Sequence, residues 1–119
     1  KGYLFLEYPA CSTCRKAKKW LDEQKVNYTD RHIVEERPTC EELKIWFERS
    51  GLPLRKFFNT SGLLYKSMQL KEKLDGMSEE KQLELLASDG KLVKRPLVIG
   101  EDFVLVGFKP EEWKTVLLK

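Results

Sequence analysis

Two of the three cysteines in this 119-residue chain, Cys11 and Cys14, are separated by only two residues. They lie in the segment EYPACSTCRKAKKW (7–20), which follows an apolar run and opens a helical pattern. A cysteine reacts as its thiolate, and at the start of a helix the unpaired backbone N–H groups and the helix dipole favour that charged form. We therefore predict that Cys11 is the nucleophile. Cys14, one helical turn later, is predicted to attack a mixed disulfide on Cys11 and close an intramolecular disulfide.

The same pair is open to two other interpretations, a zinc half-site or two inert packed thiols. A four-ligand zinc site would have to recruit His32 and Cys40, but the intervals of 17 residues from Cys14 to His32 and seven more to Cys40 match no common zinc spacing. Because CxxC on a βαβ unit is typical of a redox motif, redox chemistry is the favoured interpretation. We expect no bound cofactor or metal, and structural roles for His32 and Cys40.

Arg95 is the third candidate site residue because it directly precedes Pro96. Proline is tolerated at the first position of an edge strand, which is one explanation for this dipeptide. In a thioredoxin-like core, however, a proline at this point is usually cis and packs against the active thiol. Arg95 is therefore predicted to lie near Cys11 and to supply positive charge there. The polar loop 59–62 has no independent chemical signature and is expected to cap a helix.

The elements that must position these residues follow from apolar spacing and from turn residues. An apolar run at 3–8 and a β-branched segment at 26–34 are predicted strands, and a helix from Ser12 between them makes a parallel βαβ unit. The middle third is predicted to be helical. Its signals are a capping box formed by Thr39 and Glu42, a helix over 63–74, and a helix capped by Ser78; the runs 95–100 and 103–108 then predict a hairpin, and Pro110 a final helix.

This order of elements predicts an α/β protein with a thioredoxin-like fold. A four-stranded mixed sheet would carry a helical insertion, at about 39–90, between the βαβ unit and the C-terminal hairpin plus helix. The length suits one domain, 1–119, whose core needs no disulfide. The net charge of +3 is too small to indicate binding to nucleic acid or to a membrane, and no apolar run approaches the roughly 18 residues of a membrane span. We expect a cytoplasmic monomer with reduced thiols.

Four segments together resemble a known family, the arsenate reductase-related ArsC/Spx family. They are YPACSTCRKAKKWL (8–21), FFNTSGLLYK (57–66), LLASDGKLVKRPLVI (85–99) and LVGFKPEEW (105–113), in this order and spacing. The resemblance runs over essentially the whole chain. It implies a thioredoxin-like fold with a helical insertion, a catalytic cysteine at Cys11, and an arginine before a cis-proline at Arg95 and Pro96.

Members of this family differ in their use of the site. Arsenate reductases that depend on glutathione and glutaredoxin typically have one active cysteine and three arginines, of which only Arg95 has a counterpart here. The first of the other two falls near Asn59 and the last near Gly107 and Phe108. The second cysteine, Cys14, instead resembles Spx-type members, in which the CxxC pair is a redox switch and the protein binds the C-terminal domain of the RNA polymerase α-subunit.

The sequence therefore predicts a thiol–disulfide oxidoreductase in which Cys11, Cys14 and Arg95 form the site. The substrate would be a protein disulfide, and an external thiol such as glutathione, glutaredoxin or thioredoxin would supply electrons. The resemblance leaves two alternatives open. One is a glutaredoxin-dependent arsenate reductase acting on a small oxyanion, and the other is an Spx-type redox-sensing regulator that binds RNA polymerase.

Overall fold

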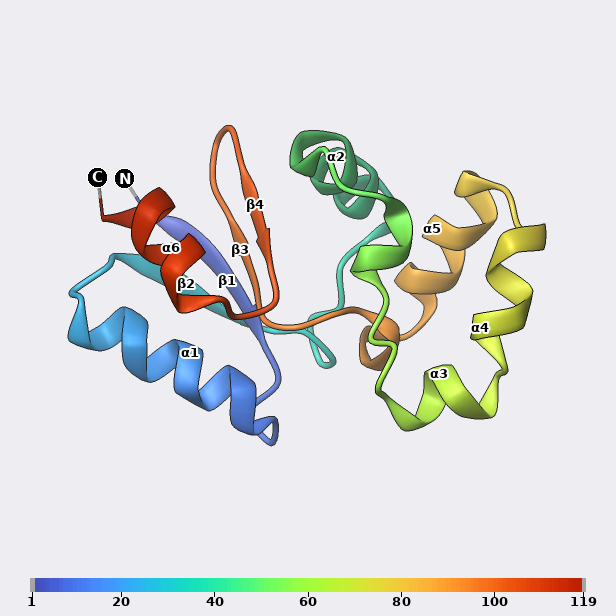
Figure 1. Ribbon diagram of the computed structural model, residues 1–119, viewed down its shortest axis with the longest axis horizontal. Helices are drawn as coiled ribbons and strands as arrows, with labels where there is room; N and C mark the ends of the chain where they lie inside the picture. The colour runs from blue at the N-terminus through green and yellow to red at the C-terminus, as the bar shows by residue number, and fades with distance from the viewer. Residues whose placement is uncertain (1, 119) are drawn as a thin grey trace.

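A four-stranded mixed sheet lies at the centre of the computed structural model, which describes residues 2–118 (Figure 1). The spatial order of its strands is β2-β1-β3-β4. β1 runs parallel to β2, whereas β3 is antiparallel to both of its neighbours. The strands are β1 (Tyr3–Glu7), β2 (Tyr28–His32), β3 (Leu97–Ile99) and β4 (Val104–Val106). The predicted thioredoxin-like α/β fold is confirmed, including its βαβ unit and its C-terminal hairpin.

One face of the sheet is covered by α1 (Ser12–Glu23) and α6 (Pro110–Leu117) (Figure 1). The buried residues of α1 recur at helical spacing, so that helix presents one apolar stripe to the strands. Phe5 and Trp113 meet edge to face in the cluster beneath α1 and α6, with ring centroids 6.5 Å apart. This packing fixes α1, and with it the cysteine pair, against the sheet.

The opposite face is covered by the helical segment that connects β2 to β3 (Figure 1). Leu6, next to Phe5 in β1, points to this side and packs in one cluster with Leu43, Phe57 and Leu86. Because successive side chains of β1 point to opposite faces of the sheet, this strand contributes to the clusters on both faces. The elements of the segment are the helices α2 (Cys40–Ser50), α3 (Leu63–Ser67), α4 (Leu70–Lys73) and α5 (Glu79–Ser88), and the 3-10 turns Leu54–Phe57, Leu74–Gly76 and Gly90–Leu92. None of the helices within residues 2–118 is long and apolar enough to cross a membrane.

The prediction of one helix over 63–74 is wrong. The segment is divided into α3, α4 and a 3-10 turn, because Gln69 has a left-handed backbone with φ 56°. Helical hydrogen bonding cannot continue through such a residue. Leucine spacing on both sides of the break is still compatible with a helix, so the sequence pattern does not reveal it.

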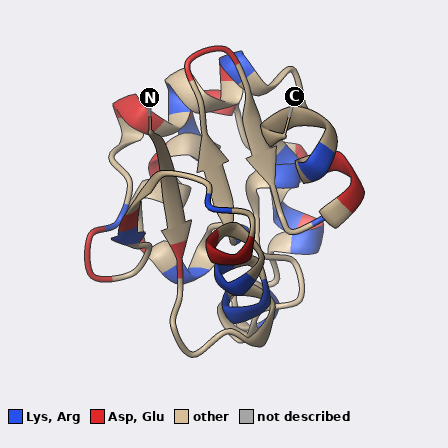
Figure 2. Cartoon of the chain, turned by 90° about the vertical axis from the view of Figure 1, so that its left-hand side faces the viewer, with Lys and Arg blue, Asp and Glu red and all other residues tan. Residues whose placement is uncertain are grey.

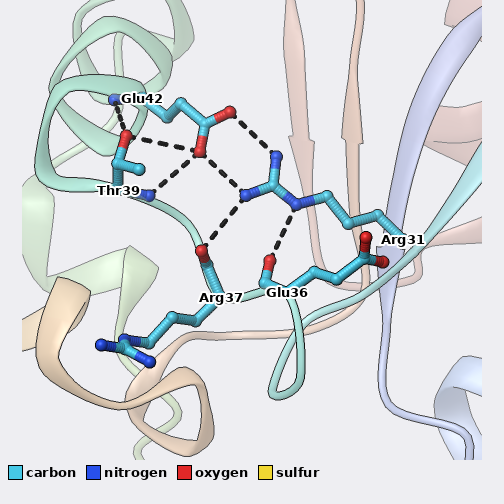
Figure 3. Close-up of polar contacts among 5 residues, drawn as sticks. All are labelled: Arg31, Glu36, Arg37, Thr39 and Glu42. Atoms are coloured by element: carbon cyan, nitrogen blue, oxygen red, sulfur yellow. Dashed lines mark hydrogen bonds and ion pairs between the residues drawn. The ribbon is translucent and has the colours of Figure 1, made fainter.

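Arg31, in β2, forms hydrogen bonds to the first turn of α2 and to the segment that connects the two elements (Figure 3). Its guanidinium donates to both carboxylate oxygens of Glu42 at 2.9 Å, and to the carbonyls of Glu36 at 2.8 Å and Arg37 at 3.2 Å. Glu42 also accepts the backbone N–H of Thr39, which completes the predicted capping box of α2. The Arg31 guanidinium lowers the pKa of Glu42 to about 2, so the pair is ionised at neutral pH.

Candidate active site

Cys11 lies in the short connection between β1 and α1 and is the N-cap residue of that helix. Its backbone is extended, with φ −86° and ψ 123°. Its N–H donates to the Tyr8 carbonyl at 2.9 Å, and its carbonyl accepts the N–H of Arg15 at 3.1 Å. The side chain is partly exposed and can meet a substrate. The sulfur is therefore held at the amino end of α1, where the sequence predicts the nucleophile.

The surroundings of Cys11 favour its thiolate. Partial burial opposes ionisation, but the backbone N–H and thiol of Cys14, the Arg95 side chain and the Thr13 N–H outweigh it, so the pKa of Cys11 lies below its ordinary value. The first turn of α1 carries no acidic residue that would raise this pKa again. The helix is instead rich in exposed basic residues, visible as blue bands on the helix at the bottom of the view (Figure 2).

Cys14 has the opposite environment. Its side chain has no exposed surface, and its sulfur accepts the Tyr8 backbone N–H at 3.5 Å. Burial, together with the negative charge of Cys11, raises the pKa of the Cys14 thiol to about 12. All three cysteines are free thiols in this structure. The surroundings therefore favour ionisation of the outer sulfur, Cys11, and oppose ionisation of the inner sulfur, Cys14.

Arg95 reaches the same site from two residues before the start of β3. The Arg95–Pro96 peptide bond is cis, as the sequence suggested. The guanidinium carbon lies 4.8 Å from the centroid of the Tyr8 ring, and Nη1 is buried without a hydrogen-bond partner among the described residues. Since the Arg95 side chain also acts on Cys11, the structure brings Cys11, Cys14 and Arg95 together. Their chemical roles stay predictions.

Cys40, His32 and Asn59 have structural environments. Cys40 is the first residue of α2 and packs against the cluster on the insertion side of the sheet. The Nδ1 atom of His32 accepts two backbone N–H groups of the following turn, at 3.2 and 3.0 Å. Asn59 is buried, and its amide donates to the Lys91 carbonyl at 3.5 Å. Within residues 2–118, no three His, Cys, Asp or Glu side chains are grouped so that they could hold a metal ion.

Glu7 and Tyr8 are two residues near the site that the sequence interpretation missed. Glu7 ends β1 with only 5% of its surface exposed, and it lies 3.5 Å from the Lys18 ammonium. Burial and then the neighbouring Asp30 raise the pKa of Glu7 to about 7. Alternation in the run 3–8 is the signal that could have found Glu7, since it shares a strand face with Phe5.

Comparison with known proteins identifies the family that has this arrangement. The model of the ArsC family matches residues 6–116, a range that contains the cysteine pair and Arg95. The chain belongs to the ArsC family. The resemblance found in its motifs is thereby confirmed.

The ArsC-family relatives of this chain include proteins with different descriptions. YusI, an uncharacterised protein of Bacillus subtilis strain 168, is 56% identical over 110 residues, which are 92% of this chain and 93% of YusI. The regulatory protein MgsR of the same organism is 32% identical over 108 residues, which are 91% of this chain and 84% of MgsR.

Solved structures of ArsC-family proteins have the same fold. A Bacteroides fragilis protein described as ArsC-family related superimposes with a TM-score of 0.94 and 63% identity, covering 97% of each chain. A possible arsenate reductase from Streptococcus mutans UA159 gives a TM-score of 0.86 and 43% identity, covering 94% of this chain and 97% of that one. This chain is thus related both to arsenate reductases and to regulatory proteins.

Proposed function

We propose that this chain is a thiol–disulfide oxidoreductase that uses Cys11 and Cys14 as its redox pair. The observation that carries the proposal is the contrast between the two thiols. Cys11 is accessible, and backbone N–H groups and Arg95 lower its pKa against the effect of burial, whereas burial raises the pKa of Cys14 to about 12. An accessible thiolate can attack a substrate, and a buried neighbouring thiol can resolve the product of that attack.

The reaction has two exchange steps. In the first, the Cys11 thiolate attacks one sulfur of a substrate disulfide, an S–S bond to Cys11 forms, and the other substrate sulfur leaves and takes up a proton. In the second, Cys14 loses its proton and attacks the Cys11 sulfur, and the remaining substrate sulfur leaves and is protonated. Two electrons pass from the cysteine pair to the substrate, which leaves as a dithiol while the pair becomes a disulfide.

The first step makes the second one easier. Part of the rise in the Cys14 pKa comes from a hydrogen bond to the Cys11 thiolate and from its negative charge, after the larger effect of burial. Once Cys11 is in a mixed disulfide, that charge is gone, while the positive charge of Arg95 still favours a Cys14 thiolate. The pKa of the inner thiol therefore falls once there is a bond for its sulfur to cleave, although burial still opposes its ionisation.

An external dithiol or thiol must restore the reduced pair. Two molecules of glutathione, or one molecule of reduced glutaredoxin or thioredoxin, could donate two electrons to the Cys11–Cys14 disulfide, so the protein itself needs no bound cofactor. Three free thiols are consistent with a reducing compartment such as the cytoplasm. The proposed substrate is a protein disulfide. These partners and this location are part of the proposal.

A trapping experiment with glutathione disulfide tests the proposal. The reduced wild-type protein should reduce the probe and form an intramolecular disulfide between Cys11 and Cys14, detected by mass spectrometry of peptides. Cys14→Ser should instead accumulate a stable glutathione adduct on Cys11, because the resolving sulfur is missing. Cys11→Ser should lose both reactions.

Cys40→Ser is the matched control, because this third cysteine packs against the hydrophobic cluster on the insertion side of the sheet. It should exchange at the wild-type rate. Undiminished exchange by Cys11→Ser, or an adduct that forms on Cys40 in preference to Cys11, would contradict the proposal.

A redox-sensing regulator is the second candidate function, and the similarity to MgsR over 91% of this chain is the observation that favours it. In that case disulfide formation between Cys11 and Cys14 would change the affinity for a partner rather than complete a catalytic cycle. Binding to the purified C-terminal domain of the RNA polymerase α-subunit, measured with the reduced and the oxidised protein, decides this alternative. Absence of binding in both states would eliminate it.

Arsenate reduction is the remaining alternative and is favoured by the similarity to the possible arsenate reductase from Streptococcus mutans. The buried, unpartnered Nη1 of Arg95 offers one donor to an oxyanion next to Cys11. Turnover of arsenate with glutathione and glutaredoxin, retained in Cys14→Ser and abolished in Cys11→Ser, would support this activity. The wild-type protein should show no turnover if disulfide exchange is its only chemistry.

A further inference from the structure

Tyr8 contacts all three residues of the candidate site. It follows β1 directly and is half-buried. Its backbone N–H donates to the Cys14 sulfur at 3.5 Å, and its carbonyl accepts the N–H of Cys11 at 2.9 Å. Its ring lies against the Arg95 guanidinium, 4.8 Å from ring centroid to guanidinium carbon. The backbone of Tyr8 thus orients the cysteines, and its side chain reaches the arginine.

The ring of Tyr8 is held in place by a second aromatic contact. His32 packs edge to face against it, with centroids 5.7 Å apart and an angle of 79° between the planes. The His32 ring is itself fixed, because its Nδ1 accepts the backbone N–H groups of Val34 and Glu35. The guanidinium therefore rests on a ring that has little freedom to move away.

Within the described residues 2–118, Arg95 has no acidic partner of the kind that usually holds a partly buried arginine. The ion pairs found within residues 2–118 do not include Arg95, and its Nη1 has no hydrogen-bond partner there. A carboxylate beside the guanidinium would fix it but would also cancel much of its charge at Cys11. The face of an aromatic ring attracts a cation without neutralising it.

We propose that Tyr8 is a positioning residue, whose ring holds the Arg95 guanidinium beside the Cys11 sulfur through a cation–π contact and leaves the positive charge available to the thiolate. This inference rests on the proposed function, because it assumes that the Cys11 thiolate is the attacking species. It assigns to Tyr8 an action through Arg95 and no direct contact with the substrate.

The test is the pH profile of Cys11 alkylation by iodoacetamide in the whole 119-residue chain, followed by mass spectrometry of the Cys11 peptide. Tyr8→Phe keeps the aromatic face and should have the wild-type midpoint. Tyr8→Leu removes it and should raise the midpoint by about 0.5 pH unit or more, the change that corresponds to a cation–π contact of ordinary strength. A midpoint in Tyr8→Leu equal to that of the wild type would overturn the inference.

A double variant shows whether Tyr8 acts through Arg95. Arg95→Gln should raise the midpoint by itself, and adding Tyr8→Leu to it should raise the midpoint no further. Additive shifts would contradict the inference, since Tyr8 would then act on Cys11 by another route. If Arg95→Gln shifts the midpoint and Tyr8→Leu does not, the inference fails and the proposed function stands. An ordinary midpoint in the wild type would instead defeat the proposed function.

Fluorinated phenylalanines at position 8 provide a test that does not depend on the folding of Tyr8→Leu. Each added fluorine weakens the negative face of the ring while the ring keeps its shape and packing. The midpoint of Cys11 alkylation should rise stepwise from phenylalanine to the mono-, di- and trifluoro forms. A flat series would show that the ring acts only by filling space, which would overturn the inference.

Discussion

At the scale of single residues, Cys11 and Cys14 have the same side chain, but their pKa values are shifted in opposite directions. Cys11 is the N-cap of α1 next to Arg95, and Cys14 is on the buried face of the same helix without exposed surface. Each thiol also changes the other, because the Cys14 thiol donates to the Cys11 thiolate and thereby lowers the pKa of Cys11 after the backbone contribution. The two sulfurs therefore form one electrostatic unit.

Replacement of Cys14 should expose this coupling. Cys14→Ala removes the donor, and we predict a rise of about one pH unit in the midpoint of Cys11 alkylation, because a hydrogen bond to a charged group has about that strength. Cys14→Ser keeps a hydroxyl donor in the same position and should show a smaller rise. Equal midpoints for the alanine and serine variants would contradict the assignment of this donor.

Glu7 gives a prediction on stability against pH. Burial, followed by the hydrogen bond and charge of Asp30, raises its pKa from 4.5 to about 7. The folded protein therefore keeps a proton that the unfolded chain loses above pH 4.5. This contribution to stability is complete below pH 4.5 and disappears as the pH rises through about 7. Its upper limit is about 3 kcal/mol.

The comparison of the wild type with Glu7→Gln isolates this effect. Urea unfolding at intervals from pH 5 to 8 should show that the free energy of unfolding falls more steeply with pH in the wild type than in the variant. Burial opposes ionisation of Asp30, but Glu7 and Lys18 outweigh this effect and lower the pKa of Asp30 below its ordinary value. Asp30 therefore titrates below this range. Lys18, whose pKa is raised by Asp30, titrates above it. Parallel curves for the two proteins would contradict the proton assignment.

At the scale of elements, the start of α2 combines a helix cap with an attachment to the sheet (Figure 3). We predict that Thr39→Ala lowers the free energy of unfolding by about 1 kcal/mol, because the N–H of Glu42 loses its acceptor at 3.1 Å. Thr39→Ser keeps the acceptor and should lie within a few tenths of a kcal/mol of the wild type. Urea melts of the three proteins measure the difference, and equal losses in both variants would contradict the capping role.

Elements whose signals are local could be predicted from the sequence. Each of these signals depends on two or three neighbouring residues. They are the capping box of Thr39, the Ser78 cap of α5, whose hydroxyl accepts the Lys81 backbone N–H, and Pro110 at the start of α6. The break at Gln69 could not be predicted, because an uncommon backbone conformation of one residue leaves the apolar spacing unchanged. Local rules describe helix ends well, but they do not reveal a left-handed residue within an apolar pattern that is otherwise helical.

The candidate site divides in the same way. Cys11 and Cys14 could be found because both signals are local: the two cysteines are close in sequence, and the helix start lies in the same short segment. The contact of Arg95 with Tyr8 joins residues far apart in the chain, and only the pairing of β1 with β3 brings them together. Sequence reasoning reached Arg95 through the proline that follows it, and it had no comparable signal for Tyr8.

At the scale of the whole molecule, the two ends of the helical insertion meet beside β2. The Ile33 N–H donates to the Glu7 carbonyl at 2.8 Å, and Gly90 lies so close that a Cβ atom on it would be 2.0 Å from the Ile33 carbonyl oxygen. Such an approach is open only to glycine, since the clash is with backbone that cannot turn aside. The single-domain organisation over 1–119 stays a prediction, and this contact is a place to test its cooperativity.

We predict that Gly90→Ala lowers the free energy of unfolding by about 2 kcal/mol or more, because the backbone at Gly90 must shift away from the backbone of Ile33 and Val34. Gly76→Ala is the matched control, since a Cβ atom there has nothing within 4 Å. Chemical denaturation followed by fluorescence and by circular dichroism measures both variants. Equal stability of the two variants would contradict the close approach at Gly90.

The most direct measurement of the central claim is the rate of Cys11 alkylation in the wild-type protein from pH 5 to 10, resolved by peptide mass spectrometry. We predict a midpoint below about 8.5, the value of an ordinary free thiol. Cys14 should remain unmodified in the native protein over this range, since burial raises the pKa of that thiol to about 12. A Cys11 midpoint at or above that of an ordinary thiol, or faster modification of Cys14 than of Cys11, would contradict the central claim.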